Sequence, residues 1–99
     1  MDYNERVARN RRLVILRALS GENDGRMNET LLGRELDHFG HACAHDEVRE
    51  LLRWLERVDA VRITMAGGTI MVAGITRRGQ DHIDRRGAPI EGVDRPSRL

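Results

Sequence analysis

Lysine is absent from the chain, and cysteine occurs once. All 17 basic residues among the 99 are arginine. Such a bias often reflects a G+C-rich coding sequence, so it is weak evidence for a nucleic-acid partner, although the guanidinium group suits bidentate contacts with phosphate or guanine. The single cysteine, Cys43, excludes an internal disulfide and fits a reducing cytoplasm.

Aromatic residues and long apolar runs are also scarce. Only Tyr3, Phe39 and Trp54 are aromatic, so the core has to be built mainly from Leu, Val, Ile and Met. No run of about 18 apolar residues is present, so no membrane span is expected, and the N-terminus has no apolar signal segment. With 39% hydrophobic and 33% charged residues, the chain has the composition of one soluble globular domain.

Charge is unevenly distributed along the chain, although the net charge is only +1. Residues 1–20 carry five arginines and two acids (+3), residues 21–60 carry five and ten (−5), and residues 61–99 carry seven and four (+3). Acids repel a phosphate backbone, so the acidic middle favours a protein partner over DNA.

The periodicity of residues 46–58 predicts the helix around which the other segments are organised. Its apolar stripe recurs at three- and four-residue steps and consists of Val48, Leu51, Leu52, Leu55 and Val58. On the opposite face Arg49, Arg53 and Arg57 follow at i, i+4 and i+8 and form a row of guanidinium groups. Asp46 is the expected N-cap.

Three further helices are predicted at residues 3–19, 29–39 and 76–86, and residues 21–27 read as a polar loop. Gly33 inside the second helix suggests a close approach to a neighbouring helix.

Residues 60–75 predict a β-hairpin around Gly67-Gly68, the signal of a two-residue turn. The resulting register pairs Met65 with Ile70 and Ile63 with Val72 on the buried face. The outward side chains are then Arg62, Thr64, Met71 and Ala73. Residues 88–99 contain two prolines and read as an extended or disordered tail, so the folded domain is expected to span residues 1–87.

The first candidate interface is the arginine row of the central helix. In a helix-turn-helix the second helix lies in the major groove, where Arg49 and Arg53 would read bases or phosphates. Arg57 would contact a phosphate, and His45 could touch a phosphate or a base. The alternative is that Arg49 and Arg53 pair with acids of the same helix on a solvated face.

The second candidate is the hairpin and the helix that follows it. Arg62 on the hairpin, with Arg77 and Arg78 beside its base, could straddle an adjacent groove. Two arginines in the first turn of a helix oppose its dipole, which hints at function. A tolerated surface pair is an equally good interpretation.

Metal binding and catalysis find little support. His41, Cys43 and His45 alternate, and His38 precedes them by one helical turn, but alternating residues point apart and no paired ligand spacing is present. No phosphate loop, carboxylate pair or Ser–His–Asp set is recognisable. We therefore expect that the protein binds no metal and no cofactor and that it is not an enzyme.

Several short motifs together resemble a family of small Mu-like phage and prophage proteins that are described as ArsR-like winged-helix regulators. They are Asp46-x-Val48-Arg49-x-x-Leu52-x-Trp54-Leu55, Thr76-x-Arg78-Gly79 and Gly92-Val93-x-Arg95-Pro96. The resemblance implies a winged-helix fold and a DNA-binding role. It does not extend to metal-regulated repression, because the paired cysteines of the arsenic sensors are missing, and Asp59 stands where relatives tend to have glycine.

From the sequence we expect a mainly α domain with a β-hairpin, namely a winged helix-turn-helix. The expected function is DNA binding by a cytoplasmic homodimer that regulates phage or prophage transcription, with residues 3–19 as the candidate dimer element. The competing hypothesis is a protein–protein interaction or assembly module that does not bind DNA.

Overall fold

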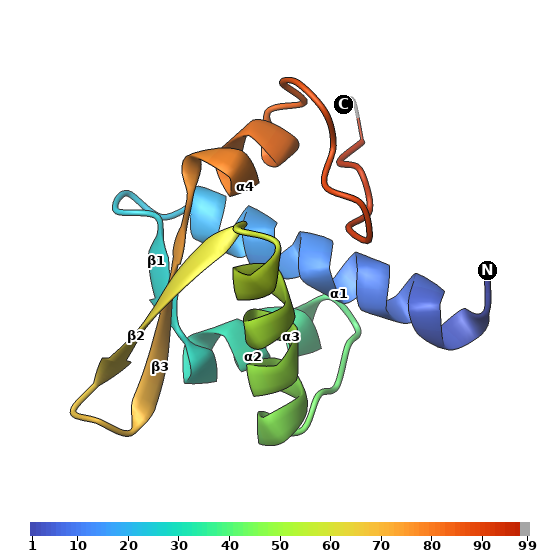
Figure 1. Ribbon diagram of the computed structural model, residues 1–99. Helices are drawn as coiled ribbons and strands as arrows, with labels where there is room; N and C mark the ends of the chain where they lie inside the picture. Colours follow the sequence, from blue (N-terminus) through green and yellow to red (C-terminus); the bar gives the residue numbers. More distant parts are fainter. Residues whose placement is uncertain (98–99) are drawn as a thin grey trace.

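The chain folds into four helices and a three-stranded sheet, and the computed structural model describes residues 1–97 (Figure 1). In chain order the elements are α1 (Tyr3–Ser20), β1 (Arg26–Asn28), α2 (Glu29–His38), α3 (His45–Arg57), β2 (Val61–Ala66), β3 (Ile70–Ile75) and α4 (Arg77–Ile83). The first three helices begin and end within one residue of their predicted bounds. α4 is shorter than predicted and ends three residues early. No helix in the described part is long and apolar enough to cross a membrane.

The sheet is antiparallel with the strand order β1-β3-β2, so β3 is central. β1 was not predicted, because three residues are too few to show an alternating pattern. The helices lie on one side of the sheet, and the tip of the β2–β3 hairpin projects beyond them (Figure 1). The expectation of a mainly α chain with only a β-hairpin is therefore corrected to an α/β arrangement in which helices cover a three-stranded sheet.

The register of the β2–β3 hairpin is shifted by one residue from the predicted one. Met65 pairs with Met71 rather than with Ile70. The cause is Thr69, which lies between the Gly67-Gly68 turn and the strand as an extra residue. Both glycines have positive φ, and the Thr69 N–H donates to the Ala66 carbonyl oxygen at 3.2 Å.

A one-residue shift exchanges the two faces of a strand. Met71 and Ala73 are consequently buried in the core, at 4% and 0% exposure, although the sequence placed them outside. Ile70, at 42% exposure, and the half-buried Val72 face outward instead.

The apolar stripes of α1, α2 and α3 meet in one core against the inner face of the sheet. The fully buried side chains of these helices are Ile15, Leu16, Leu19, Leu32, Leu36, Leu52 and Leu55. The second half of α1 supplies three of them, as its all-round apolar sequence predicts. The first half of α1 extends away from the other elements (Figure 1).

Residues 88–97 belong to the folded domain and do not lie outside it as a tail. They contain no helix or strand, but Ile90 and Val93 are 2% and 1% exposed and join the core. His82 of α4 holds this segment with both ring nitrogens. Its Nδ1 accepts a hydrogen bond from the Ile90 N–H at 3.0 Å, and its Nε2 donates to the Asp94 carbonyl oxygen at 2.9 Å.

The C-terminal segment also closes the junction between α1 and α3. Gly92 has φ +93°, and a Cβ at this position would come within 2.7 Å of the Trp54 ring. The Gly92 carbonyl oxygen accepts a hydrogen bond from Arg12 at 2.9 Å. The guanidinium of Arg12 lies 3.8 Å from the centre of the Trp54 ring, a distance typical of a cation–π contact.

Candidate nucleic-acid interface

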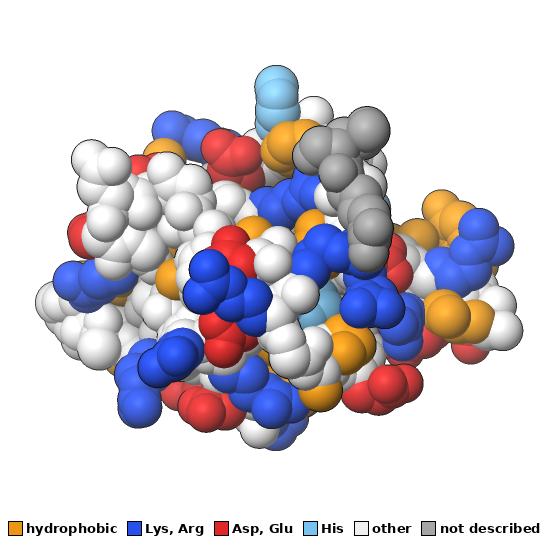
Figure 2. All heavy atoms as spheres, turned by 90° about the horizontal axis from the view of Figure 1, so that it is seen from above, with side chains coloured by type: hydrophobic (Ala, Val, Ile, Leu, Met, Phe, Trp, Pro, Cys, Tyr) orange, Lys and Arg blue, Asp and Glu red, His pale blue; other side chains and the backbone are white. Residues whose placement is uncertain are grey.

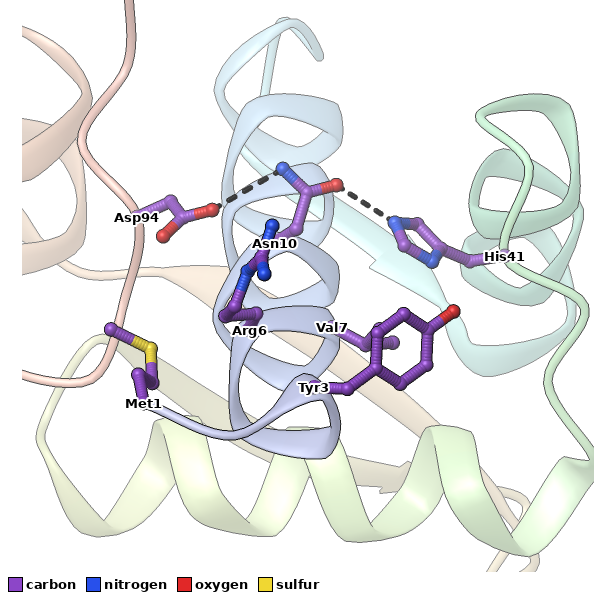
Figure 3. A pocket seen from close by; sticks show the side chains of 7 residues that line it. All are labelled: Met1, Tyr3, Arg6, Val7, Asn10, His41 and Asp94. Atoms are coloured by element: carbon purple, nitrogen blue, oxygen red, sulfur yellow. Dashed lines mark hydrogen bonds between the residues drawn. The ribbon is translucent and has the colours of Figure 1, made fainter.

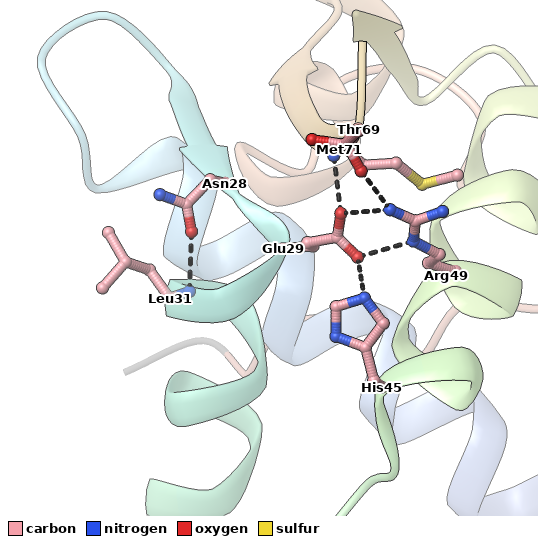
Figure 4. A network of polar contacts seen from close by, with 7 residues as sticks. All are labelled: Asn28, Glu29, Leu31, His45, Arg49, Thr69 and Met71. Carbon is pink, nitrogen blue, oxygen red and sulfur yellow. Dashed lines mark hydrogen bonds and ion pairs between the residues drawn. The ribbon is translucent and has the colours of Figure 1, made fainter. Parts of the chain in front are cut away.

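Arg49, the first arginine of the α3 row, is partly exposed and is bound by the buried carboxylate of Glu29 (Figure 4). Arg49 Nε and Nη2 donate to the two carboxylate oxygens at 2.7 and 2.8 Å, and Nη2 also donates to the Thr69 carbonyl oxygen at 2.6 Å. His45 Nε2 donates to the same carboxylate at 2.7 Å. Two of the predicted DNA contacts, His45 and Arg49, therefore connect α3 to α2 and to the hairpin.

Glu29 also continues the sheet where β1 ends. Arg26 to Asn28 pair with Gly74 to Val72, so the next position opposite Met71 falls on Glu29. Glu29 is already the first residue of α2, and its side chain accepts the Met71 N–H at 2.6 Å in place of a strand carbonyl. The hydrogen bonds from Arg49 and Met71 lower the pKa of Glu29 to about 2, against the opposing effect of burial.

The other two arginines of the row have different surroundings. Arg53 donates to Glu56 of the same helix at 2.9 Å, as the solvated-face alternative proposed. Arg57 is exposed and forms no ion pair within residues 1–97. At the start of the helix, Ala44 replaces the expected N-cap Asp46, and its N–H donates to the Glu47 carboxylate at 2.8 Å. The outward face of α3 is thus a mixture of both charges.

Two arginines lie on the outer face of the sheet, which no helix of residues 1–97 covers. Arg26 in β1 and Arg62 in β2 are both paired with Gly74 of the central strand, so their side chains share one face. A Cβ at Gly74 would meet Arg26 Cγ at 3.3 Å. Because glycine leaves this space open, Arg26 reaches across β3 and its Nη2 donates to Thr64 Oγ1 of β2 at 3.4 Å.

Both outer-face arginines are exposed, and in the described part of the chain neither forms an ion pair with an acid. Thr64 and Arg62 lie two residues apart on this face, which corresponds to about 6.6 Å along a strand. The Arg26 guanidinium, bonded to Thr64, therefore lies on the same face of the sheet as Arg62. Two positive charges on one face of the sheet create a positive potential there, which attracts anionic groups.

Arg77 and Arg78 begin α4 directly after β3. Both are exposed, and Arg77 makes only a long ion pair, 4.0 Å, with Asp81. Figure 2 shows the side that carries α4 and the C-terminal segment, where arginine side chains alternate with acidic ones. This side is not a continuous basic surface.

His41, two residues before Cys43, contacts Asn10 of α1 (Figure 3). His41 Nε2 lies 2.8 Å from Asn10 Oδ1, and Asn10 Nδ2 donates to Asp94 at 3.4 Å. Burial, with a smaller effect of nearby Arg11, lowers the pKa of His41. Burial likewise raises the pKa of the Cys43 thiol. Within residues 1–97 no three side chains of metal-binding type come together.

The sequence interpretation missed Glu29 and Arg26 as site residues. Glu29 looked like an ordinary acid in the first turn of a helix. Its partner Arg49 lies 20 residues away, and nothing local marks the contact. Arg26 lay in a stretch interpreted as a loop. The sequence signal for this contact is Gly74, the residue opposite Arg26, because a glycine inside a strand often marks the close approach of another group.

Two curated proteins and one family match the chain. It is 39% identical over 93 residues to "Uncharacterized protein gp26" of Escherichia phage Mu, covering 94% of each chain. It is 38% identical over 78 residues to a protein of Haemophilus influenzae, covering 79% of this chain and 76% of that one. The family described as "GHMP kinases C terminal" matches residues 10–85. No solved structure matches.

The family match corrects the expected fold class. GHMP kinase C-terminal domains are α/β, so the assignment of a winged helix-turn-helix, made from the order of helices and hairpin and from the motif resemblance, is wrong. The resemblance to Mu-like phage proteins is confirmed by the two relatives, but neither of them indicates an ArsR-like regulator. The chain belongs to the GHMP kinases C-terminal family and, with gp26 of phage Mu, to a family of Mu-like phage proteins.

Proposed function

We propose that the chain binds double-stranded DNA, without catalysis, through the arginines of the outer sheet face. The observation that carries the proposal is the pair Arg26 and Arg62, which share one uncovered face and form no ion pair within the described residues. A guanidinium forms two parallel hydrogen bonds with a phosphate, so two adjacent ones suit a phosphodiester backbone. Arg77 and Arg78 directly follow the end of β3 near Gly74. We propose that they add further phosphate contacts to those of Arg26 and Arg62.

The central helix, α3, contributes fewer DNA contacts to this proposal than its row of three arginines predicted. Arg49 is bound to Glu29 and Arg53 to Glu56, so neither offers a free guanidinium to DNA. Only Arg57 of that row is exposed without an ion pair in the described part. The contacts we propose are therefore to phosphates, and the cellular role we attach to them is regulation of phage or prophage transcription in the bacterial cytoplasm.

The test is a salt titration of a fluorescently labelled duplex, followed by anisotropy. Each phosphate contact contributes about 0.9 to the slope of log Kd against log salt concentration. The double variant Arg26→Ala with Arg62→Ala should bind more weakly and should lower the slope by about 2. The double variant Arg17→Ala with Arg34→Ala removes the same two charges from exposed positions of α1 and α2 and serves as the matched control, with little expected effect.

A protein–protein interaction or assembly module without DNA binding is the second candidate. The observation that favours it is the self-paired, mixed-charge outward face of α3. If the wild-type chain does not bind duplex at about 50 mM salt, where phosphate contacts are strong, this candidate replaces DNA binding. A double variant that binds as tightly as wild type and with an unchanged slope would refute the outer-face assignment.

A further inference from the structure

In the described part of the chain, no strand pairs with the outer side of β2 at one edge of the sheet. β2 is an edge strand that pairs antiparallel with β3. Along such a pair, every second residue of β2 forms backbone hydrogen bonds with β3, and the residues between do not. The bond from the Thr76 N–H to the Ala60 carbonyl oxygen, 3.1 Å, fixes the phase of this alternation. The N–H and C=O groups of Val61, Ile63 and Met65 therefore point away from β3, toward the free edge.

Within residues 1–97 this edge has only one of the features with which proteins usually prevent strands from pairing, a charged side chain. The others, which are absent there, include proline, a bulge, an inward-pointing charge and a covering segment. β2 is six residues long, contains no proline, and carries a single charge, Arg62, on the outer face. A hollow of about 430 Å³ lies beside the strand, lined by Glu56 and Asp59 from the end of α3 and by residues 61–64. An added strand would enter this hollow.

The edge is complementary to itself. In an antiparallel pair with a two-fold axis at Ile63, Val61 of one copy lies opposite Met65 of the other, and Arg62 lies opposite Thr64. The three outward residues then form hydrogen-bonded pairs, and no like charges face each other directly. Met65 is 42% exposed and Ile63 is half-buried, so pairing would cover apolar surface that the monomer leaves in water.

We infer that β2 pairs antiparallel with β2 of a second copy, joining two three-stranded sheets into one of six strands. The same patch serves both partners, as a two-fold interface requires. Pairing would place the two Arg62 side chains diagonally across the axis, about 7–8 Å apart at the Cα atoms. The inference rests on the strand edge and not on DNA binding, although a dimer would double the outer-face arginines on one surface.

The experiment uses sedimentation equilibrium of the full chain without DNA, over about 1 to 500 µM, because an interface of one strand pair is small and should be weak. Wild type should dimerise within this range. Thr64→Arg places a second cation opposite Arg62 at both ends of the interface and should raise the dimer Kd about tenfold. Thr64→Glu places an anion there and should lower it.

A charge-swap variant separates the interface from effects on folding. Thr64→Arg combined with Arg62→Glu restores opposite charges across the axis, and dimerisation should return to at least the wild-type level. Thr64 is exposed, so each variant should keep the circular dichroism spectrum of wild type. A chain that stays monomeric up to about 500 µM overturns the inference, as does a dimer that is insensitive to position 64. DNA binding can fail in its own test without altering either outcome.

Discussion

At the scale of single residues, Glu29 has a role that its position alone does not explain. A carboxylate in the first turn of a helix stabilises the dipole by a few tenths to about 1 kcal/mol. Here the same carboxylate is 2% exposed and accepts hydrogen bonds from His45, from Arg49 twice and from the Met71 N–H. Each of these donors belongs to a different element from Glu29, so one side chain joins α2, α3 and the hairpin.

We expect Glu29→Gln to lower the free energy of unfolding by about 1–3 kcal/mol, because a neutral amide replaces the charged acceptor of Arg49 and of the buried Met71 N–H. The effect should depend on pH. The pKa of Glu29 lies at about 2 in the folded state and at 4.5 ordinarily. A lowered pKa stabilises the folded state fully above 4.5, and that stabilisation is lost as the pH falls toward 2.

Urea denaturation between pH 7 and pH 2 measures this difference. Wild type and Glu29→Gln should differ most at neutral pH and should converge below pH 4.5. Glu22→Gln, in the exposed loop after α1, is the control and should follow wild type throughout. A constant gap between wild type and Glu29→Gln at every pH would contradict the assigned role of the carboxylate.

At the scale of elements, two helical glycines differ in whether the surrounding structure leaves space for a side chain. A Cβ at Gly33 of α2 would lie 3.8 Å from Val48 Cγ2, an ordinary contact, so the close approach predicted from the sequence does not occur. A Cβ at Gly79 of α4 would collide with the Ala60 carbonyl oxygen and would lie 2.8 Å from Ile75 Cγ1. Here the close approach is real.

The alanine variants should therefore move stability in opposite directions. Gly33→Ala removes the conformational cost of a mid-helix glycine and should raise the free energy of unfolding by about 0.5–1 kcal/mol. Gly79→Ala forces α4 away from the start of β2 and should lower it by about 1–3 kcal/mol. Thermal melts of both variants beside wild type test the pair. Destabilisation by Gly33→Ala would mean that α2 and α3 are packed more tightly than the structure indicates.

Helices were predictable from the sequence because their apolar stripes repeat within each segment. The hairpin was predictable, but its register was not. Ile70, Met71, Val72 and Ala73 are all apolar, so the alternation that would identify the buried face is missing. The length of the turn therefore sets the register, and Thr69 lengthens the turn by one residue. β1 exists only by pairing with β3, which lies about 46 residues later.

At the scale of the whole molecule, the parts that sequence reasoning missed depend on distant contacts. Arg49 belongs to the predicted row of guanidinium groups. Its guanidinium is bound by Glu29 and Thr69, which each lie 20 residues away in the sequence. Residues 88–97 contain two prolines and Gly92, and Gly87 precedes them, so locally the sequence resembles a flexible tail. Their burial depends on His82 and on the space that Gly92 leaves for Trp54.

The C-terminal segment should therefore open as a unit when its anchor is removed. His82→Ala deletes the acceptor for the Ile90 N–H and the donor to the Asp94 carbonyl oxygen, and buried polar groups left without partners cost about 1–3 kcal/mol each. Native-state hydrogen exchange should show faster exchange at Ile90 and Val93, while the amides of α3 keep most of their protection. Arg86→Ala, on an exposed residue beside the segment, is the control. If the Ile90 amide stays as protected in His82→Ala as in wild type, the apolar contacts of Ile90 and Val93 hold the segment without the histidine.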